Sequence, residues 1–580
     1  MLKKLMKGIG EYRGLAIATP LFILGEAVIE CIIPFIIAKL VNDINAGCEY
    51  SVIVKRGVSL FMFAVLSLAC GAAAAYTASN AAAGFAKNLR KMLFYSVQRF
   101  SFSNIDKFSS SSLVTRMTTD VESVRFAFMM IIRGAVRAPL MFIFSIIMAY
   151  VMGGKLSLMF VVVVPVMLGG LLLIGYKALP SFRRVFKKYD KLNESIEENV
   201  MAARSVKGFA REEYEKDKFA RASDAIRREF TRAERIVALN GPLMQTCLYA
   251  NMIAVLTLGS YIIISSSGAD LGVGELSGML TYGFQILMSL MMLSIIFVMV
   301  TMSAEGARRI VEVLDEEPSI TNTEKPVSAV ADGSVEFSDV SFKYAADGER
   351  YALDGVNLYI GSGETVGILG DTGSAKSTLV MLIPRLYDPT VGSVRVGGVD
   401  CRDYDLTVLR DSVSMVLQNN VLFSGTIADN LRWGNENATD EEIRAAAALA
   451  QADEFINTFP EGYDTYIEQG GANVSGGQKQ RLCIARALLK KPKILILDDS
   501  TSAVDTRTDA LIRKGFREFI PETTKIIIAQ RVASVQDADN IIIMHNGHIE
   551  DMGTHDELME SSQTYREIFE EQTRGGDSDE

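Results

Sequence analysis

Long apolar runs alternate with charged stretches over the first half of the chain, and this pattern changes near residue 303. Six segments are long and apolar enough to cross about 30 Å of hydrocarbon. They are 15–41, 57–79, 131–152, 156–178, 240–265 and 277–302. After about residue 335 the chain is charged, and short apolar strands alternate with helical segments. The pattern therefore predicts a domain of six transmembrane helices over 1–303, followed by an α/β domain.

The connections between these segments differ in their content of lysine and arginine. The stretches 87–137 and 177–236 are rich in both residues, whereas 153–155 and 265–275 together contain only Lys155. Basic connections stay on the cytoplasmic side of a membrane. We therefore expect a multi-pass plasma-membrane protein with both termini and the α/β domain in the cytoplasm. The first apolar run is too long for a signal peptide, so we expect it to be retained.

The two long basic connections have helical spacing and almost no proline or glycine. Because a helix rises about 1.5 Å per residue, helices of this length extend over tens of ångströms. We expect them to project into the cytoplasm as levers. The alternative is that they are amphipathic helices on the protein surface.

Two acidic residues lie within the first predicted span. Glu26 and Glu30 are four residues apart and therefore share one face of a helix. An ionisable group inside a membrane normally faces a cavity or the protein interior. Two interpretations remain open: the pair binds a cationic substrate in a substrate cavity, or it only solvates an aqueous vestibule. The last span is rich in methionine, which suits varied apolar ligands and ordinary packing alike.

The composition narrows the class of protein further. The length of 580 residues suggests about three or four domains. A net charge of −10 with no dense basic stripe argues against nucleic acid as the main partner. The three histidines lack the spacing of a metal site, and the six cysteines form no CxxC pair and indicate no disulfide framework. We expect Cys48 to lie outside the membrane.

Residues 304–334 lose the long apolar runs and gain proline and charge, which is typical of a linker. The domain expected over 335–572 begins with an alternating strand, followed by a second strand, a glycine-rich turn and a helix. An acidic flexible tail is expected over 573–580.

The glycine-rich turn fits the phosphate-binding pattern G-x-x-x-x-G-K-[ST], except that Ala375 replaces the second glycine. In such a loop the backbone N–H groups face the phosphates of ATP, Lys376 reaches the β- and γ-phosphates, and Ser377 binds Mg²⁺. Alanine is tolerated at 375 if its φ angle is negative, so we expect ATP binding to survive. The predicted ATP-binding residues of this loop are Gly370, Asp371, Thr372, Gly373, Ser374, Ala375, Lys376, Ser377 and Thr378.

A second motif for ATP and Mg²⁺ lies further along the chain. The apolar run 494–497 ends in two acids, Asp498 and Asp499. A carboxylate at the end of a buried strand is suited to orient Mg²⁺, so we expect Asp498 to hold the ion. The two motifs together predict ATP and Mg²⁺ as cofactors.

Between these motifs, VSGGQ at 474–478 resembles the signature of ATP-binding cassette (ABC) domains. With six spans ahead of it, the chain is similar to a half-transporter of the ABC exporter family. Gln418 matches the loop glutamine that touches the metal, and Tyr344 matches the aromatic residue that stacks on adenine. The other matches are the loop between two cassettes, at 500–505, and the intracellular helices that press on the cassettes, at 116–125 and 203–212.

This resemblance implies a mechanism. Two cassettes sandwich two ATP molecules, and closure turns the membrane cavity outward until hydrolysis reopens it. Each ATP is held by the phosphate loop of one chain and the signature of the other. The signature residues that would act on the partner's ATP are Ser475, Gly476, Gly477 and Gln478. The implied partners are a homologous half-transporter chain, the lipid bilayer and a hydrophobic or amphipathic substrate.

Two residues depart from the family's catalytic pattern. The family's general base is a glutamate after the magnesium aspartate, where this chain has Asp499, one methylene shorter. A misplacement of about 1 Å can slow a reaction roughly 100-fold. The family's histidine at the γ-phosphate is replaced by Gln530, which cannot carry charge toward the transition state. Gln469 also stands where an acid is expected.

These departures, beside an intact signature, predict a degenerate site that binds ATP and hydrolyses it slowly or not at all. The pattern resembles one subunit of a bacterial heterodimeric multidrug exporter, whose partner would supply the glutamate and the histidine. The alternatives are a homodimer with two slow sites, including a homodimeric lipid or peptide exporter, and an ATP-switched membrane sensor without transport. An importer is disfavoured because the spans and the cassette share one chain.

Overall fold

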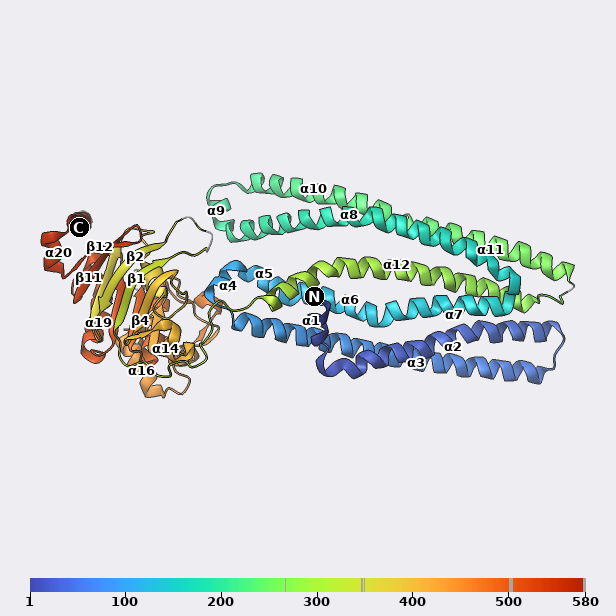
Figure 1. The fold of residues 1–580 in the computed structure, drawn as a ribbon, viewed down its shortest axis with the longest axis horizontal. Helices are drawn as coiled ribbons and strands as arrows, with labels where there is room; N and C mark the ends of the chain where they lie inside the picture. The colour runs from blue at the N-terminus through green and yellow to red at the C-terminus, as the bar shows by residue number, and fades with distance from the viewer. Residues whose placement is uncertain (267, 346–347, 349, 500–503, 577–580) are drawn as a thin grey trace. The chain divides into compact units, whose positions relative to one another are not determined.

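The chain folds into two units, one helical and one α/β (Figure 1). The computed structural model describes residues 1–580 except 267, 346–347, 349, 500–503 and 577–580. The helical unit comprises Met1–Arg99 and Phe108–Glu316. The α/β unit comprises Phe100–Lys107 and Glu317–Glu580. The predicted order of a helical domain followed by an α/β domain is confirmed.

Long helices that lie side by side dominate the helical unit (Figure 1). α2 packs along α3, α12 along α7, and α10 along α8. The long helices are α2 (Arg13–Asn45), α3 (Tyr50–Gln98), α7 (Ala135–Gly153), α8 (Phe160–Met201), α10 (Glu212–Val237), α11 (Asn240–Ser265) and α12 (Val273–Asp315). The short elements are α1 (Leu2–Lys7), η1 (Gly10–Tyr12), α5 (Ser110–Thr115), η2 (Arg116–Asp120), α6 (Val121–Met129), η3 (Met130–Gly134), η4 (Gly154–Met159) and α9 (Ala203–Gly208).

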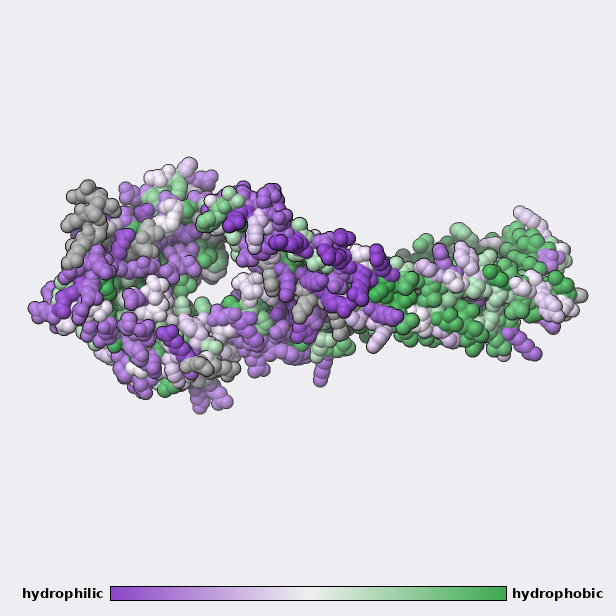
Figure 2. All heavy atoms as spheres, turned by 90° about the horizontal axis from the view of Figure 1, so that it is seen from above, coloured by the Kyte–Doolittle hydropathy of each residue, from purple (hydrophilic) through white to green (hydrophobic). Residues whose placement is uncertain are grey.

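Within the described residues, five stretches are long and apolar enough to cross a membrane. One of them, Ser110–Phe182, contains both predicted spans 131–152 and 156–178. These two spans are separated because α7 ends at Gly153 and Gly154 takes a left-handed φ of 47°, where the chain turns into α8. The apolar surface gathers at the end of this unit where these helices turn (Figure 2).

The basic connections are helical over most of their length. α3 continues past the predicted span to Gln98, and α8 continues to Met201. α12 runs without a break to Asp315, past residue 303 and into the predicted linker. Its last turns remain helical since Ala307, Ile310 and Val313 form a buried stripe on one face. The irregular part of the predicted linker therefore starts only at Glu316.

A six-stranded sheet forms the centre of the α/β unit, in the order β12-β11-β3-β10-β9-β6. All neighbouring pairs are parallel except β11 and β12. The strands β9 and β10 are buried on both faces, as the apolar runs predict for a parallel sheet. The strands are β3 (Thr365–Gly370), β6 (Val413–Val416), β9 (Ile494–Asp498), β10 (Thr524–Ile528), β11 (Asn540–His545) and β12 (His548–Gly553).

Two smaller sheets complete the strands of this unit. An antiparallel sheet has the order β2-β1-β4-β5, and β7 pairs with β8. Their bounds are β1 (Val335–Phe342), β2 (Leu353–Ile360), β4 (Val391–Val396), β5 (Val399–Asp400), β7 (Gly425–Thr426) and β8 (Tyr466–Ile467).

Helices cover the central sheet and carry the site residues. In the described part of this unit, four helices (α15, α16, α18 and α20) begin with capping boxes, in which a Ser or Thr and an acid or amide three residues later satisfy the first N–H groups. The helices are α4 (Phe102–Lys107), α13 (Lys376–Met381), α14 (Leu406–Ser412), α15 (Ile427–Arg432), α16 (Asp440–Leu449), α17 (Asp453–Ile456), α18 (Gly476–Leu489), α19 (Thr506–Phe519), α20 (His555–Ser561) and α21 (Gln563–Gly576). The 3₁₀ turns are η5 (Cys401–Asp403), η6 (Gly462–Asp464), η7 (Gln469–Gly471) and η8 (Val532–Ser534). The tail predicted from 573 thus begins within α21, and 577–580 lie outside the described residues.

Candidate functional site

The carboxyl ends of four neighbouring strands bring the predicted site residues to one edge of the central sheet. β3 ends at Gly370 and leads into the glycine-rich loop, while β9 ends at Asp498. Gln530 follows β10 by two residues, and Gln418 follows β6 by two residues. Because parallel strands all point the same way, loops far apart in sequence meet at this edge.

The glycine-rich loop holds its lysine and serine by specific contacts. Lys376 Nζ donates to the carbonyl oxygens of Gly370 and Asp371, each at 2.7 Å. Burial lowers the pKa of Lys376. Ser377 Oγ donates to Asp498 Oδ1 at 2.9 Å, and burial raises the pKa of Asp498. A hydroxyl and a carboxylate oxygen therefore lie together, and oxygen donors of this kind fit Mg²⁺.

Ala375 does not have the negative φ angle that we expected. Its φ is 73° and its ψ is 23°, in the left-handed region, and it is the residue directly before α13. The expectation was wrong because the chain must enter the helix from this conformation, which normally calls for glycine. The alanine therefore carries backbone strain of about 1 kcal/mol or more.

Asp499 lies at the centre of a small polar cluster. Its Oδ2 atom accepts a hydrogen bond from Gln530 Nε2 at 2.7 Å and one from Gln418 Nε2 at 3.3 Å. Its φ is 47°, a left-handed conformation that aspartate tolerates better than most residues. The two residues that depart from the family pattern, Asp499 and Gln530, thus contact each other directly.

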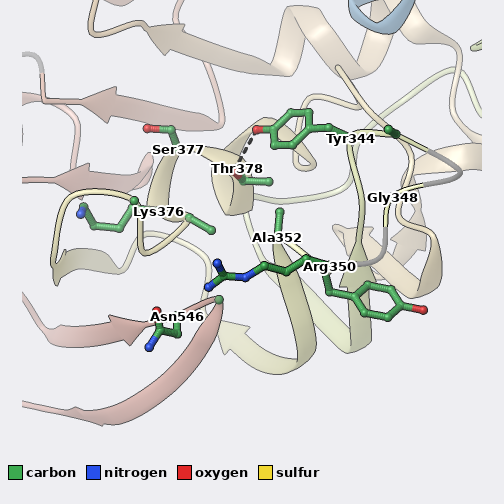
Figure 3. Close-up of a pocket in the computed structure, with 13 residues that line it drawn as sticks. Tyr344, Gly348, Arg350, Ala352, Lys376, Ser377, Thr378 and Asn546 are labelled. Atoms are coloured by element: carbon green, nitrogen blue, oxygen red, sulfur yellow. Dashed lines mark hydrogen bonds between the residues drawn. The ribbon is translucent and has the colours of Figure 1, made fainter.

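A pocket of about 810 Å³ adjoins the loop (Figure 3). Tyr344 lines it and shares a 2.9 Å hydrogen bond between its hydroxyl and Thr378 Oγ1. Lys376 and Ser377 line the same pocket. Sequence reasoning missed seven residues that also line it, among them Arg350, Tyr351, Asn546 and Gly547. Asn546 and Gly547 follow β11, the neighbour of β3, so strand order was the signal that could have found them.

The signature residues lie on a different surface of the same unit. Ser475 caps α18: its Oγ accepts from the N–H of Gln478 at 3.3 Å, and Gln478 Oε1 accepts from the N–H of Ser475 at 2.9 Å. Ser475, Gly476 and Gly477 line a separate hollow of about 470 Å³, together with Arg481, Val504 and Asp505. This hollow shares no lining residue with the pocket at the glycine-rich loop.

Two other predictions have different outcomes. Gln469 is exposed, opens the 3₁₀ turn η7 and is not among the residues that line either pocket. Of the loop predicted at 500–505 to contact a second cassette, residues 500–503 lie outside the described residues.

The two acids of the first span are paired with a base. Arg137 of α7 contacts Glu30 Oε1 and Oε2, each at 2.7 Å, and Glu26 Oε1 at 3.5 Å. The sequence analysis placed Arg137 among the basic residues of a connection and did not pair it. Neither of the two interpretations offered for the acids included such a partner.

The fold and this site define a membrane-embedded ATPase in which the helical and nucleotide-binding units share one chain. The family model for the ABC transporter transmembrane region matches residues 16–303, and the ABC transporter model matches residues 353–502. The ABC transporter ATP-binding protein YfiB of Bacillus subtilis is 36% identical over 571 residues, which cover 98% of each chain.

Two further likenesses are more distant or partial. A multidrug efflux ATP-binding/permease protein of Mycobacterium bovis is 37% identical over 391 residues, which cover 64% of this chain and 31% of that protein. The structure of a bacterial Atm1-family ABC exporter with ATP bound has the same fold, with a TM-score of 0.84, 24% identity, and coverage of 97% and 98% of the two chains.

The chain belongs to the ABC transporter family, as its sequence resemblance predicted. It has a transmembrane region followed by an ATP-binding domain, and its fold is that of the Atm1-family exporter structure. Its activity is ATP hydrolysis coupled to transport across a membrane.

Proposed function

We propose that this chain is the degenerate-site subunit of a heterodimeric exporter, which moves hydrophobic or amphipathic, drug-like compounds outward across the plasma membrane. The observation that carries the proposal is the cluster in which Gln530 and Gln418 both donate to Asp499 Oδ2. In the family pattern, that carboxylate would belong to a glutamate and the first donor would be a histidine.

The cluster is poorly suited to activate water. A general base needs a free lone pair within reach of the attacking water and a neighbour that can stabilise the charge that develops. Here one carboxylate oxygen already accepts two amide hydrogens, and an amide cannot take up a proton. The side chain of Asp499 is also one methylene shorter than that of glutamate. We infer that ATP is held at this site and hydrolysed slowly.

The residues of the loop and around it are suited to hold ATP and Mg²⁺. In our proposal Lys376 and the loop N–H groups bind the phosphates, and Tyr344 stacks on the base. Ser377, Asp498 and the amide oxygen of Gln418 would hold Mg²⁺, which neutralises phosphate charge when it is bound. These roles leave Asp499 as the degenerate base and Gln530 as the degenerate switch residue.

The signature residues make this chain suited to complete an ATP site on another chain. Ser475 and Gly477 line their own hollow at the start of α18, where N–H groups and the helix dipole favour a phosphate. Since the ATP pocket of this chain has a different lining, the ATP at the signature would be the partner's. The partner in this proposal is a homologous half-transporter that has glutamate and histidine at the positions of Asp499 and Gln530.

The substrate class rests on two supports. The apolar surface of the helical unit suits a hydrophobic environment (Figure 2). One relative is a multidrug efflux protein, although it matches only part of this chain. The lysine and arginine pattern supports a cytoplasmic α/β unit, and the likeness to the fold of an exporter structure supports outward transport.

The proposal is tested by co-expressing this chain with such a partner and measuring the ATPase activity of the purified complex. We expect much higher activity than from this chain alone. Asp499→Asn should change the turnover of the complex less than twofold, because the working base lies on the other chain. The matched variant Asp498→Asn should instead weaken ATP retention at this site, measured with a fluorescent nucleotide in Mg²⁺.

Two results would contradict the proposal. Equal activity from the purified homomer would favour a homodimer with two working sites. Loss of turnover in Asp499→Asn would identify Asp499 as a working base.

A further inference from the structure

Three charged side chains form a triad inside the helical unit. Glu26 and Glu30 lie on α2, and Arg137 lies on α7. Arg137 Nη2 is 2.7 Å from both carboxylate oxygens of Glu30 and 3.5 Å from Glu26 Oε1. Two acids and one base give the triad a formal charge of −1.

Glu26 is the buried member of the triad. It is 9% exposed, and within the described residues its Oε2 atom is buried and has no hydrogen-bond partner. It packs against Gly71 of α3, where a Cβ atom would lie 3.3 Å from the carboxyl carbon of Glu26. The side chains of Glu30 and Arg137 are 28% and 37% exposed, so they form the accessible side of the triad.

An uncompensated negative charge is expensive within a membrane-spanning helix bundle. Arg137 Nη2 contacts both carboxylate oxygens of Glu30. The buried Oε2 of Glu26 has no hydrogen-bond donor within the described residues. A ligand that brings one positive charge would neutralise the triad and would gain a charge-assisted contact. A ligand with two positive charges would give the triad and ligand a net charge of +1, and a neutral ligand would leave the charge of −1 uncompensated.

We propose that the triad binds the cationic group of an amphipathic substrate and selects ligands that carry one positive charge. This inference rests on the proposed function as an exporter of amphipathic compounds. Glu30 provides the accessible contact with the ligand, and the more buried Glu26 adds a second negative charge. Arg137 cancels one of the two charges and leaves the triad with a formal charge of −1.

Ethidium and propidium test this selection because they share one aromatic ring system and carry one and two positive charges. Nile red serves as a neutral amphipathic probe. The dissociation constants are measured by fluorescence with the full-length chain in lipid nanodiscs, so the readout needs neither ATP nor a partner. We expect the unmodified protein to bind ethidium more tightly than propidium.

Single substitutions should follow the charge of the triad. Glu26→Gln and Glu30→Gln each bring the formal charge to zero and should weaken ethidium binding about tenfold or more, the value of a charge-assisted contact. Arg137→Gln brings the charge to −2 and should shift the preference toward propidium. Nile red binding should stay unchanged in every variant because the probe is neutral, and an unchanged midpoint of thermal unfolding reports that the helical unit is folded.

The double variant Glu30→Gln/Arg137→Gln separates charge selection from a structural role. It restores a formal charge of −1 and should recover ethidium binding relative to Glu30→Gln. A purely structural triad would be damaged further by the second substitution. Asp43→Asn is the matched control, because Asp43 also lies on α2 and pairs with an arginine, Arg56, at 3.3 Å.

The outcomes that would overturn the inference are distinct from a failure of the proposed function. Ethidium affinity that is unchanged in Glu26→Gln and Glu30→Gln would overturn it, as would an absence of rescue in the double variant. Competition by excess sodium chloride that equals competition by unlabelled organic monocations would assign the triad to inorganic ions instead. Binding of Nile red without ethidium would overturn this inference and leave export of amphipathic compounds standing.

Discussion

At the scale of single residues, the conformation at Ala375 and the contacts of Asp499 were the features that the sequence did not determine. The pattern of the sequence predicts a phosphate-binding loop from Gly370 to Thr378, but it does not predict the left-handed φ of 73° at Ala375. That angle follows from how the loop must enter α13, which depends on the positions of β3 and the helix together. The substitutions at Asp499 and Gln530 were readable from the sequence, whereas their 2.7 Å contact required the strand order β10-β9.

Ala375→Gly should stabilise the protein by about 1 kcal/mol, because glycine adopts a left-handed conformation without the steric strain of a Cβ atom. The midpoint of thermal unfolding of the full chain should rise accordingly. ATP affinity should rise or stay equal, since the loop N–H groups keep their direction.

The matched control is Ala445→Gly, an exposed position inside helix α16. There the same substitution should destabilise by about 1 kcal/mol, because the residue is right-handed helical. A fall in the midpoint for Ala375→Gly would show that Ala375 carries no strain.

At the scale of elements, α18 begins at a residue that has a structural role in the helix cap and a proposed role at the partner's ATP. Ser475 satisfies the first N–H groups of the helix together with Gln478, and it also lines the signature hollow. A loss of activity in Ser475→Ala is therefore ambiguous, since the lost cap alone costs about 1 kcal/mol.

Ser475→Asp resolves the ambiguity. Aspartate is as good a cap as serine, so the unfolding midpoint should stay within about 1 °C of the original, a small change for a cap exchange. The added negative charge would face a γ-phosphate, so the ATPase activity of the complex should be lost. The control Thr439→Asp changes the cap of α16, whose capping box uses Glu442, and should retain both stability and activity. Full activity of Ser475→Asp would exclude a role of the serine at an ATP site.

The helix α4 could not be assigned from the sequence to the unit in which it lies. It connects α3 and α5 of the helical unit, yet Phe100–Lys107 belongs to the α/β unit. Tyr387 is one cause of this placement: its hydroxyl donates to Asp106 Oδ2 at 2.6 Å, and its ring contacts those of Phe102 and Tyr344. The contact joins residues 281 positions apart, which no local periodicity indicates.

Tyr387→Phe should loosen α4 while leaving the ring contacts in place. The lost hydrogen bond goes to a carboxylate, a contact worth about 1.5–3 kcal/mol. Hydrogen–deuterium exchange of Phe100–Lys107 should therefore become faster by at least tenfold. Tyr404→Phe is the control, because its hydroxyl donates to the Val396 carbonyl within the same unit and does not touch α4. Unchanged exchange in Tyr387→Phe would mean that the ring contacts and the hydrogen bonds of Ser101 and Asn104 to residues 317–320 hold the helix without this hydroxyl.

At the scale of the whole molecule, the order and class of the two parts were predictable because each follows from a simple physical rule. A membrane demands long apolar helices, and a parallel sheet demands short buried strands. The end of α12 at Asp315 was missed because its last turns are amphipathic and lack the apolar excess of a span. The pairing of Arg137 with Glu30 was missed because it joins residues 107 positions apart on two different helices.

The orientation of the chain in the membrane is the last feature that the distribution of lysine and arginine predicts. Cys48 lies between α2 and α3 and is partly exposed. Cys70 is also partly exposed but lies in α3 within the predicted span 57–79, and Cys31, Cys247, Cys401 and Cys483 are buried. A membrane-impermeant maleimide should therefore label Cys48 on intact cells, because the positive-inside rule places this connection outside. Cys48→Ser should abolish the labelling. Ser205→Cys in that background adds an exposed thiol on α9, which should react only after the cells are permeabilised. Labelling of Ser205→Cys on intact cells would show that the orientation is the reverse of the predicted one. The proposed direction of transport would then be wrong as well.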